Sequence, residues 1–196
     1  MNQEAAPAGW RTVDIVVVAV IAVAFGAVFQ AWNVVWEAVR PAFAALPPLQ
    51  GLIYGVWMLP AVIAPLVVRK PGAALFAELV AASASALFGA PWGLLTIVYG
   101  LVEGGAAELI FAMTGYRRWN VGVAIIAGAA AGVGGALLDL VMYYPSWAAS
   151  WQVTYAVLVT ASSAVVAGLG GWLLTRALAD TGVLAPFPSG RSQRTV

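Results

Sequence analysis

Long apolar runs are the feature of this sequence that most limits its fold. A helix that crosses about 30 Å of hydrocarbon needs about 20 mostly apolar residues, at 1.5 Å of rise per residue. Six stretches of the 196-residue chain meet this requirement. They are residues 13–36, 49–68, 72–88, 92–113, 121–143 and 153–178. Proline and glycine occur in or beside the connections. We therefore expect an all-α integral membrane protein, built as one compact bundle of six transmembrane helices.

The composition supports this class and excludes several others. Hydrophobic residues make up 63% of the chain and charged residues 9%, which is more apolar surface than a soluble domain of this size can bury. The sequence has no Cys and no His, so we expect no disulfide, no metal site and no Ser-His or Cys-His catalysis. It also has no basic tract for nucleic acid and no Gly-rich ATP-binding loop. We expect a protein without enzymatic activity or a cofactor.

Basic residues predict the orientation of the bundle. With six spans, both tails share one side of the membrane with the second and fourth loops. Eight of the nine Lys and Arg residues lie on that side, and Arg40 is the exception. Because cytoplasmic loops carry an excess of Lys and Arg, we expect a plasma-membrane protein with both termini in the cytoplasm. The tails at 1–9 and 186–196 are expected to be flexible.

Small residues recur at helical spacing within three of the spans. Gly100 and Gly104 are four residues apart in the fourth span, and Gly128 and Gly132 are four residues apart in the fifth. The fifth span extends the same face to Ala124 and Ala136, and Ala164 and Gly168 form a similar face in the sixth. Such faces let helices approach closely in lipid, so they predict tight packing.

Aromatic residues are concentrated on the side of the membrane opposite to the termini. Eleven of the fifteen Trp and Tyr residues lie there, whereas interfacial belts would populate both surfaces. Part of the excess is typical of such a belt, and the rest indicates a pocket that opens outward. Helical spacing places aromatic and polar residues of several spans at one depth. The residues that we expect to bind a ligand are Gln30, Trp32, Asn33, Tyr54, Trp57, Glu78, Tyr99 and Glu103.

Four carboxylates fall within the spans, namely Glu78, Glu103, Glu108 and Asp139. An ionisable group in the bilayer centre is unfavourable by about 2.5–3.5 kcal/mol, and such groups usually face the bundle interior or a water-filled cavity. Glu103 lies deepest. Glu78 and Glu108 have a second interpretation as surface ion pairs, with the basic residues at 69–70 and at 117–118, respectively.

Acids surrounded by aromatic faces suit a flat cationic ligand, because stacking and cation–π attraction act together with the charge. The amides of Gln30, Asn33 and Gln50 could bind the donor and acceptor edge of a heterocycle. An alternative is a proton-coupled exporter of lipophilic cations, in which a proton exchanges with the drug at Glu103. A third interpretation is a structural bundle without a ligand.

Three motifs resemble the YkoE family, whose members are substrate-binding S components of energy-coupling factor (ECF) vitamin transporters. They are RKPGAALFAE at 69–78, GLVEGGAAELIF at 100–111 and GYRRWN at 115–120. The resemblance implies a thiamin or hydroxymethylpyrimidine ligand, bound near the outer face. It also implies a membrane-embedded coupling subunit and two ATP-binding subunits as partners.

The resemblance also implies a docking face for the coupling subunit on the first helix. S components of this kind commonly dock through an Ala-x-x-x-Ala face there. The match at suitable depth is Ala22 and Gly26, with Gly in the second place, while Ala27 and Ala31 lie further out.

Overall fold

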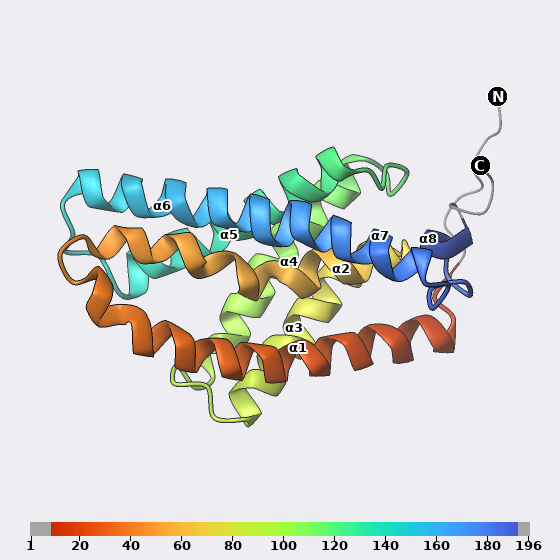
Figure 1. The fold of residues 1–196 in the computed structure, drawn as a ribbon, viewed down its shortest axis with the longest axis horizontal. Coiled ribbons are helices and arrows are strands. Elements are labelled where there is room, and N and C mark those ends of the chain that lie inside the picture. Colours follow the sequence, from red (N-terminus) through yellow and green to blue (C-terminus); the bar gives the residue numbers. More distant parts are fainter. Residues whose placement is uncertain (1–8, 192–196) are drawn as a thin grey trace.

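The structure, a computed structural model, describes residues 9–191, which fold into helices joined by turns and contain no strand. In chain order the helices are α1 (Thr12–Val39), η1 (Arg40–Phe43), η2 (Pro47–Met58), α2 (Leu59–Val68), α3 (Ala73–Leu87), α4 (Leu95–Met113), α5 (Val121–Met142), α6 (Ala149–Ser163), η3 (Ala164–Gly170), α7 (Gly171–Asp180) and α8 (Pro188–Arg191). In Figure 1, α1, α2, α6 and α7 run along the long axis of the molecule. The predicted all-helical architecture is confirmed.

Five helical segments within the described residues are long and apolar enough to cross a membrane. They are Thr12–Phe43, Pro47–Val68, Leu95–Met113, Val121–Met142 and Ala149–Asp180. The last of them joins α6, η3 and α7 into one rod. The predicted third span corresponds to α3, which has 15 residues. That is about 22 Å of helix, too short for a perpendicular crossing of the hydrocarbon. The count of six membrane crossings therefore stays a prediction.

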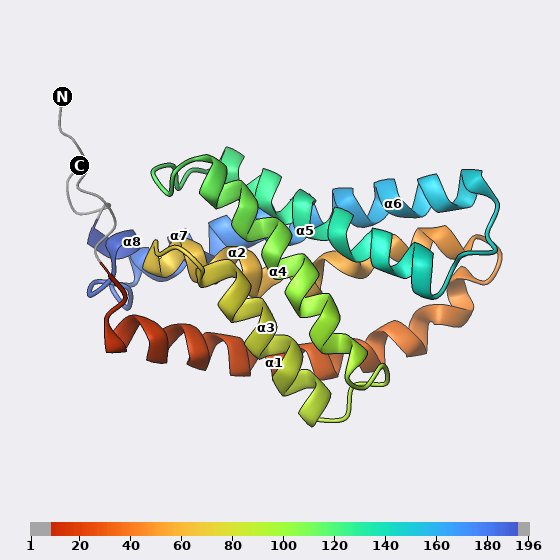
Figure 2. The same ribbon diagram turned by 180° about the vertical axis from the view of Figure 1, so that it is seen from behind.

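Helices α3 and α4 lie side by side and run obliquely across α1 (Figures 1 and 2). Their close approach depends on Gly100 and Gly104. A Cβ atom at Gly100 would lie 2.5 Å from the Cβ of Ala82, and one at Gly104 would lie 2.8 Å from the Cβ of Glu78. The α5 and α6 backbones approach each other in the same way at Gly128. The predicted packing through small residues is confirmed at these positions.

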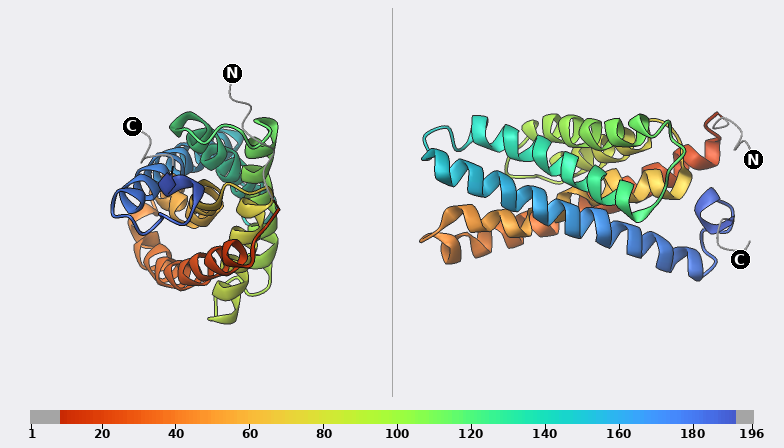
Figure 3. Two further views of the ribbon diagram at one scale, coloured as in Figure 1. Left: turned by 90° about the vertical axis from the view of Figure 1, so that its right-hand side faces the viewer. Right: turned by 90° about the horizontal axis from the view of Figure 1, so that it is seen from above.

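Helix α2 lies in the middle of the bundle when the molecule is viewed along its long axis (Figure 3). Nine of its ten residues are buried. Helix α2 continues from η2, a 3₁₀ helix of 12 residues. Pro60 explains the end of this 3₁₀ segment, because it has no N–H to donate to the carbonyl oxygen of Trp57, which the next i+3 bond would need. The last i+3 bond runs from the N–H of Leu59 to the carbonyl oxygen of Val56.

Ser162 of α6 joins η2 to the rest of the bundle. Its hydroxyl accepts a hydrogen bond from the backbone N–H of Gly55 at 3.0 Å and donates one to the carbonyl oxygen of Leu52 at 2.8 Å. A Cβ atom at Gly55 would lie 2.5 Å from the carbonyl oxygen of Ser162. This contact therefore requires a glycine in η2 and a short hydroxyl side chain in α6.

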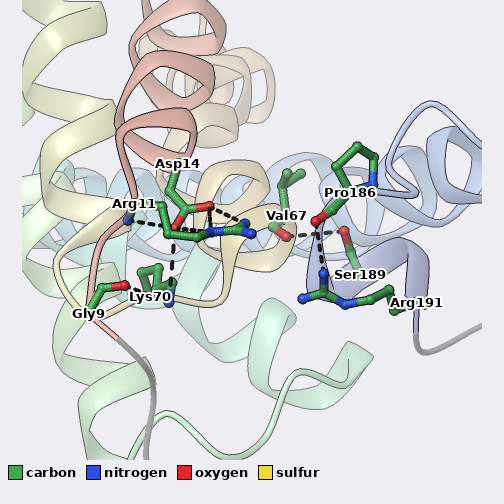
Figure 4. Close-up of polar contacts among 8 residues, drawn as sticks. All are labelled: Gly9, Arg11, Asp14, Val67, Lys70, Pro186, Ser189 and Arg191. Carbon is green, nitrogen blue, oxygen red and sulfur yellow. Dashed lines mark hydrogen bonds and ion pairs between the residues drawn. The ribbon is translucent and has the colours of Figure 1, made fainter.

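The start of α1 and the short helix α8 lie at the same end of the long axis, which we call the terminal end (Figure 1). Polar contacts hold this end together (Figure 4). Asp14 is fully buried and accepts hydrogen bonds from Arg11, the shortest at 2.7 Å. Lys70 lies 4.0 Å from the Asp14 carboxylate and donates to the carbonyl oxygen of Gly9 at 3.0 Å.

Residues 186–191, which we expected in a flexible tail, instead pack against the terminal end. Phe187 is buried in an apolar cluster with residues of α1 and α2. The hydroxyl of Ser189 donates to the carbonyl oxygen of Val67 at 3.1 Å (Figure 4). The burial of this apolar segment explains the difference from the expectation. The remaining expected tail residues, 1–8 and 192–196, lie outside the described residues.

Candidate ligand-binding site

A cavity of about 300 Å³ lies between α1, η2, α3, α4 and α5, toward the end of the molecule opposite to the terminal end. Its lining includes Phe29, Asn33, Trp36, Glu37, Arg40, Tyr54, Trp57, Glu78, Ala82, Ser85, Trp92, Thr96, Tyr99, Glu103, Asp139, Tyr143 and Tyr144. Glu37, Arg40 and Tyr143 are exposed and mark the mouth, whereas Glu78 and Glu103 are at most 4% exposed and mark the floor. The volume lies at the lower end of the range for small-molecule sites.

Four aromatic rings form a continuous wall of the cavity. The ring of Trp57 lies 4.9 Å from Trp36, 5.1 Å from Tyr54 and 5.8 Å from Trp92, each measured between centroids. All of these pairs meet edge to face, which is a favoured arrangement for aromatic quadrupoles. These ring contacts therefore fix the shape of the wall.

The 3₁₀ geometry of η2 decides which of its residues line the cavity. In a 3₁₀ helix residues i and i+3 lie on the same side, so Tyr54 and Trp57 both face the cavity. Gln50, whose amide was predicted to bind the edge of a heterocycle, is outside the lining and donates to the carbonyl oxygen of Trp36 at 2.9 Å. The helix type thus separates Gln50 from the two aromatic residues.

Three buried carboxylates line the cavity, and each has a different set of partners. Glu103 Oε1 accepts a hydrogen bond from the Tyr54 hydroxyl at 3.3 Å. Glu78 Oε2 accepts from the backbone N–H of Ala61 at 2.9 Å, at the start of α2, where helix N–H groups lack intrahelical partners. Asp139 accepts at both of its oxygens from tyrosine hydroxyls.

Gly135 of α5 leaves the space that the Glu103 carboxylate occupies. A Cβ atom at this position would lie 2.5 Å from Glu103 Oε1 and 2.9 Å from the Tyr54 hydroxyl oxygen. The adjacent Gly134 faces Val102 instead. One glycine on α5 therefore accommodates the pair that forms part of the cavity floor.

Neutral polar groups occupy the α1 and α3 side of the cavity. The indole N–H of Trp57 donates to Asn33 Oδ1 at 3.1 Å, and Asn33 Nδ2 lies 3.5 Å from the hydroxyl oxygen of Ser85. Asn33 Nδ2 also donates to Gln30 at 3.3 Å. This side offers hydrogen-bonding groups without net charge, next to the aromatic wall.

The mouth carries the one basic residue of the lining. Arg40 and Glu37 form an exposed ion pair at 3.4 Å. Burial raises the pKa of Tyr144 to about 12, and the Asp139 carboxylate acts in the same direction. The Tyr144 hydroxyl is therefore neutral at physiological pH and can donate a hydrogen bond.

The structure brings six of the eight predicted binding residues to the cavity: Asn33, Tyr54, Trp57, Glu78, Tyr99 and Glu103. Gln30 and Trp32 are outside the lining. Gln30 supports the Asn33 amide, and the Trp32 indole N–H donates to the carbonyl oxygen of Ile53 at 3.0 Å, which ties α1 to η2. These two residues therefore stabilise elements that form the cavity without lining it themselves.

Two other expectations change. Ala22 and Gly26 are buried under α3, and a Cβ atom at Gly26 would lie 2.5 Å from the Cβ of Ala84. Because α3 covers this face, the pair is a packing contact and not an exposed docking surface. For Glu108, the alternative of a surface ion pair is not observed, since its carboxylate caps α3 by accepting from the N–H groups of Gly72 at 2.6 Å and Ala74 at 2.9 Å.

Several lining residues were not among the predicted binding residues. Trp36, Trp92 and Asp139 carry the same aromatic and acidic signal as the predicted set, and the fold adds them because their helices converge. The sequence gives no sign that Ser85 and Thr96 line a cavity, since a hydroxyl side chain in an apolar span is common. Arg40 could have been found only from its position at the outer end of the first helix.

The arrangement can bind a small planar ligand of positive charge. Acids form the floor, aromatic faces form the wall, and neutral amide and hydroxyl groups are available for a heterocycle edge. Among residues 9–191 there is no group of three or more His, Cys, Asp or Glu residues that could hold a metal ion. The acidic side chains of the cavity are therefore not grouped as ligands of one metal ion.

Comparisons with known proteins agree with the motif resemblance. Residues 13–134 match the family described as "ABC-type cobalt transport system, permease component". The chain is 33% identical over 183 residues to "Putative HMP/thiamine permease protein YkoE" of Bacillus subtilis (strain 168), an alignment that covers 93% of this chain and 91% of the relative. A solved structure described as "Crystal structure of an S-component of ECF transporter" matches with a TM-score of 0.90 and 32% identity, over 95% of this chain and 94% of that one.

Proposed function

We propose that this chain is the S component of an ECF vitamin importer. The chain belongs to the YkoE-like family of ABC-type transport permease components, and the proposal starts from that membership. In this role it captures thiamin or its hydroxymethylpyrimidine precursor and delivers it to a coupling subunit. Separate ATP-binding subunits supply the energy, because the chain itself has no Gly-rich ATP-binding loop.

The observation that carries the proposal is the buried carboxylate of Glu103 at the floor of an aromatic cavity. Among the described residues Glu103 makes no ion pair, and its donor is the Tyr54 hydroxyl at 3.3 Å. A carboxylate in low dielectric is stable in its charged form only when a cation or several donors compensate it. A cationic ligand in the cavity supplies that compensation.

Thiamin joins an aminopyrimidine to a positively charged thiazolium, and the two halves of the cavity match these two rings. The acid floor with Glu103 and Glu78 suits the cation. The side with Asn33 and Ser85 suits the hydrogen-bonding edge of the pyrimidine. The indole of Trp57 lies between the two and offers a surface for stacking.

Cobalt, which the description of the matching family mentions, is a less suitable substrate for this cavity. Imidazole nitrogen is a preferred ligand of such divalent transition metals, and the chain has no His. The acids of the described residues are not grouped as a metal site. The donor set therefore favours an organic cation.

The partner surface is proposed on the exposed side of α1, with the termini in the cytoplasm and the cavity mouth outside the cell. Ala27 and Ala31 are both exposed and four residues apart, so a partner helix can approach the α1 backbone there. Ala27→Trp is expected to leave ligand binding unchanged and to abolish uptake in cells that carry the coupling subunits. Leu109→Trp, on the exposed face of α4, is the matched control and should transport normally.

The proposal is tested by titration calorimetry of the purified protein in detergent with three ligands: thiamin, hydroxymethylpyrimidine and Co²⁺. We expect saturable binding of thiamin with one site per chain, tighter than that of the neutral pyrimidine, and no saturable binding of Co²⁺. Binding of Co²⁺ alone, or of none of the three, would overturn the proposed substrate class.

A further inference from the structure

At the cavity wall, one carboxylate joins three helices through two tyrosines. The Tyr99 hydroxyl of α4 donates to Asp139 Oδ1 at 2.5 Å, and the Tyr155 hydroxyl of α6 donates to Asp139 Oδ2 at 2.6 Å. Asp139 itself lies on α5 and is 7% exposed. Hydrogen bonds of this length to a carboxylate are of the strong, charge-assisted kind. We call these three residues the Tyr-Asp-Tyr triad.

Tyr155 stands outside the cavity lining but contacts several residues that belong to it. Its side chain is 1% exposed. Its ring meets Tyr54 edge to face at 6.5 Å and Tyr144 at 5.2 Å, and both of these residues line the cavity. Through its hydroxyl it also fixes Asp139. Any effect of Tyr155 on a ligand is therefore indirect.

Asp139 and Glu103 differ in how fully their carboxylate oxygens are hydrogen-bonded, and this difference indicates different roles. Both oxygens of Asp139 are engaged by short hydrogen bonds, whereas Glu103 has one longer bond at 3.3 Å. A ligand cation that approached Asp139 would have to compete with two tyrosine hydroxyls. The same cation meets no such competition at the second oxygen of Glu103.

We propose that Asp139 and Tyr155 are positioning residues, which hold the ring of Tyr99 as a fixed part of the cavity wall, and that the counter-charge for the ligand comes from Glu103. This inference rests on the proposed function. A tyrosine anchored at its hydroxyl has already lost its side-chain freedom before the ligand arrives, and such preorganisation strengthens binding without adding a contact. The triad therefore acts on the shape of the site and not on its charge.

Two ligands that differ in charge separate these roles. Thiamin is a cation, and hydroxymethylpyrimidine is the neutral fragment of the same molecule. Loss of a positioning residue should weaken both to the same extent, whereas loss of the counter-charge should weaken thiamin alone. The ratio of the two dissociation constants is thus a readout that loss of a structural contact does not change.

The experiment measures both dissociation constants for the wild type, Asp139→Asn, Tyr155→Phe and the double variant. We expect each single variant to weaken both ligands by about three- to tenfold, as for one hydrogen bond, with the ratio unchanged. The loss of affinity in the double variant should not exceed the product of the two single losses. It should be close to the loss in one single variant, because both changes release the same side chain, Tyr99. Tyr116→Phe is the control, since it removes a hydroxyl beside a different carboxylate, Glu108, away from the cavity, and should bind like the wild type.

Two results would overturn the inference. One is a loss of thiamin affinity in Asp139→Asn at least tenfold greater than the loss of pyrimidine affinity, which would make Asp139 the counter-charge. The other is wild-type affinity for both ligands in Tyr155→Phe, the milder variant, at an unchanged melting temperature. If the wild type binds neither ligand, the proposed function fails first, and the inference fails with it.

Discussion

Gly135→Ala is the substitution that tests the geometry of the cavity floor most locally. The added Cβ atom would lie 2.5 Å from Glu103 Oε1 and 2.9 Å from the Tyr54 hydroxyl oxygen. Ordinary contact needs about 3.5 Å, so the carboxylate has to move by about 1 Å. The movement breaks the 3.3 Å bond between Tyr54 and Glu103 and turns the acid away from the ligand.

The expected loss follows from the kind of interaction that is disturbed. A hydrogen bond to a charged group contributes about 1.5–3 kcal/mol, which corresponds to about ten- to hundredfold in the dissociation constant. We expect a loss of this size for thiamin and a smaller loss for the neutral pyrimidine. The fold should survive, because the atom in closest contact is the end of the flexible Glu103 side chain and alanine has a higher helix propensity than glycine.

The assay is titration calorimetry of detergent-purified protein, with the melting temperature measured in parallel. Gly105→Ala is the matched control, since a Cβ atom there would meet nothing within 4 Å. It should bind both ligands like the wild type. The reasoning is refuted if Gly135→Ala binds thiamin with wild-type affinity, or if Gly105→Ala loses as much.

Two further predictions address the aromatic wall and the support of η2. Trp57→Ala should weaken thiamin binding by about 1–3 kcal/mol, by analogy with base stacking on aromatic side chains. Trp151 lies outside the cavity lining, so Trp151→Ala is the control and should bind thiamin like the wild type. Equal thiamin affinities of the two variants in calorimetry would show that Trp57 does not contact the ligand. Ser162→Ala should destabilise the protein by about 1–3 kcal/mol, because it leaves the buried Gly55 N–H without the Ser162 oxygen and removes the hydroxyl that donates to the Leu52 carbonyl oxygen. Ser163→Ala should be neutral or stabilising in the same thermal unfolding assay, since the buried Ser163 hydroxyl has no hydrogen-bond partner among the described residues; the opposite order of melting temperatures would contradict the assigned contacts.

The apolar runs allowed most of the helices to be predicted, because length and hydropathy decide where a helix can lie in a membrane. The third span was expected at 72–88 and is observed as Ala73–Leu87. The cap at the start of α3 could not be predicted in the same way, because it comes from Glu108 on another helix, α4. That contact joins residues 36 positions apart and has no local sequence signal.

The candidate site was predictable where residue type alone decides the outcome. Buried acids and clustered aromatic residues rarely occur in a bilayer without a reason, so Glu103 and Trp57 could be found. The placement of Gln50 could not, because an α-helical spacing was assumed where η2 is a 3₁₀ helix. The buried positions of Ala22 and Gly26 were equally inaccessible, since small residues suit an internal helix contact and an external one alike.

The central claim is that the Glu103 carboxylate provides the counter-charge for a cationic ligand. The most direct measurement is the ratio of the dissociation constants for thiamin and hydroxymethylpyrimidine, in the wild type and in Glu103→Gln. Glutamine keeps the size of the side chain and its acceptor for the Tyr54 hydroxyl but removes the charge. We predict that Glu103→Gln loses affinity for thiamin by at least about tenfold and keeps its affinity for the neutral pyrimidine. An unchanged ratio of the two constants would contradict the claim.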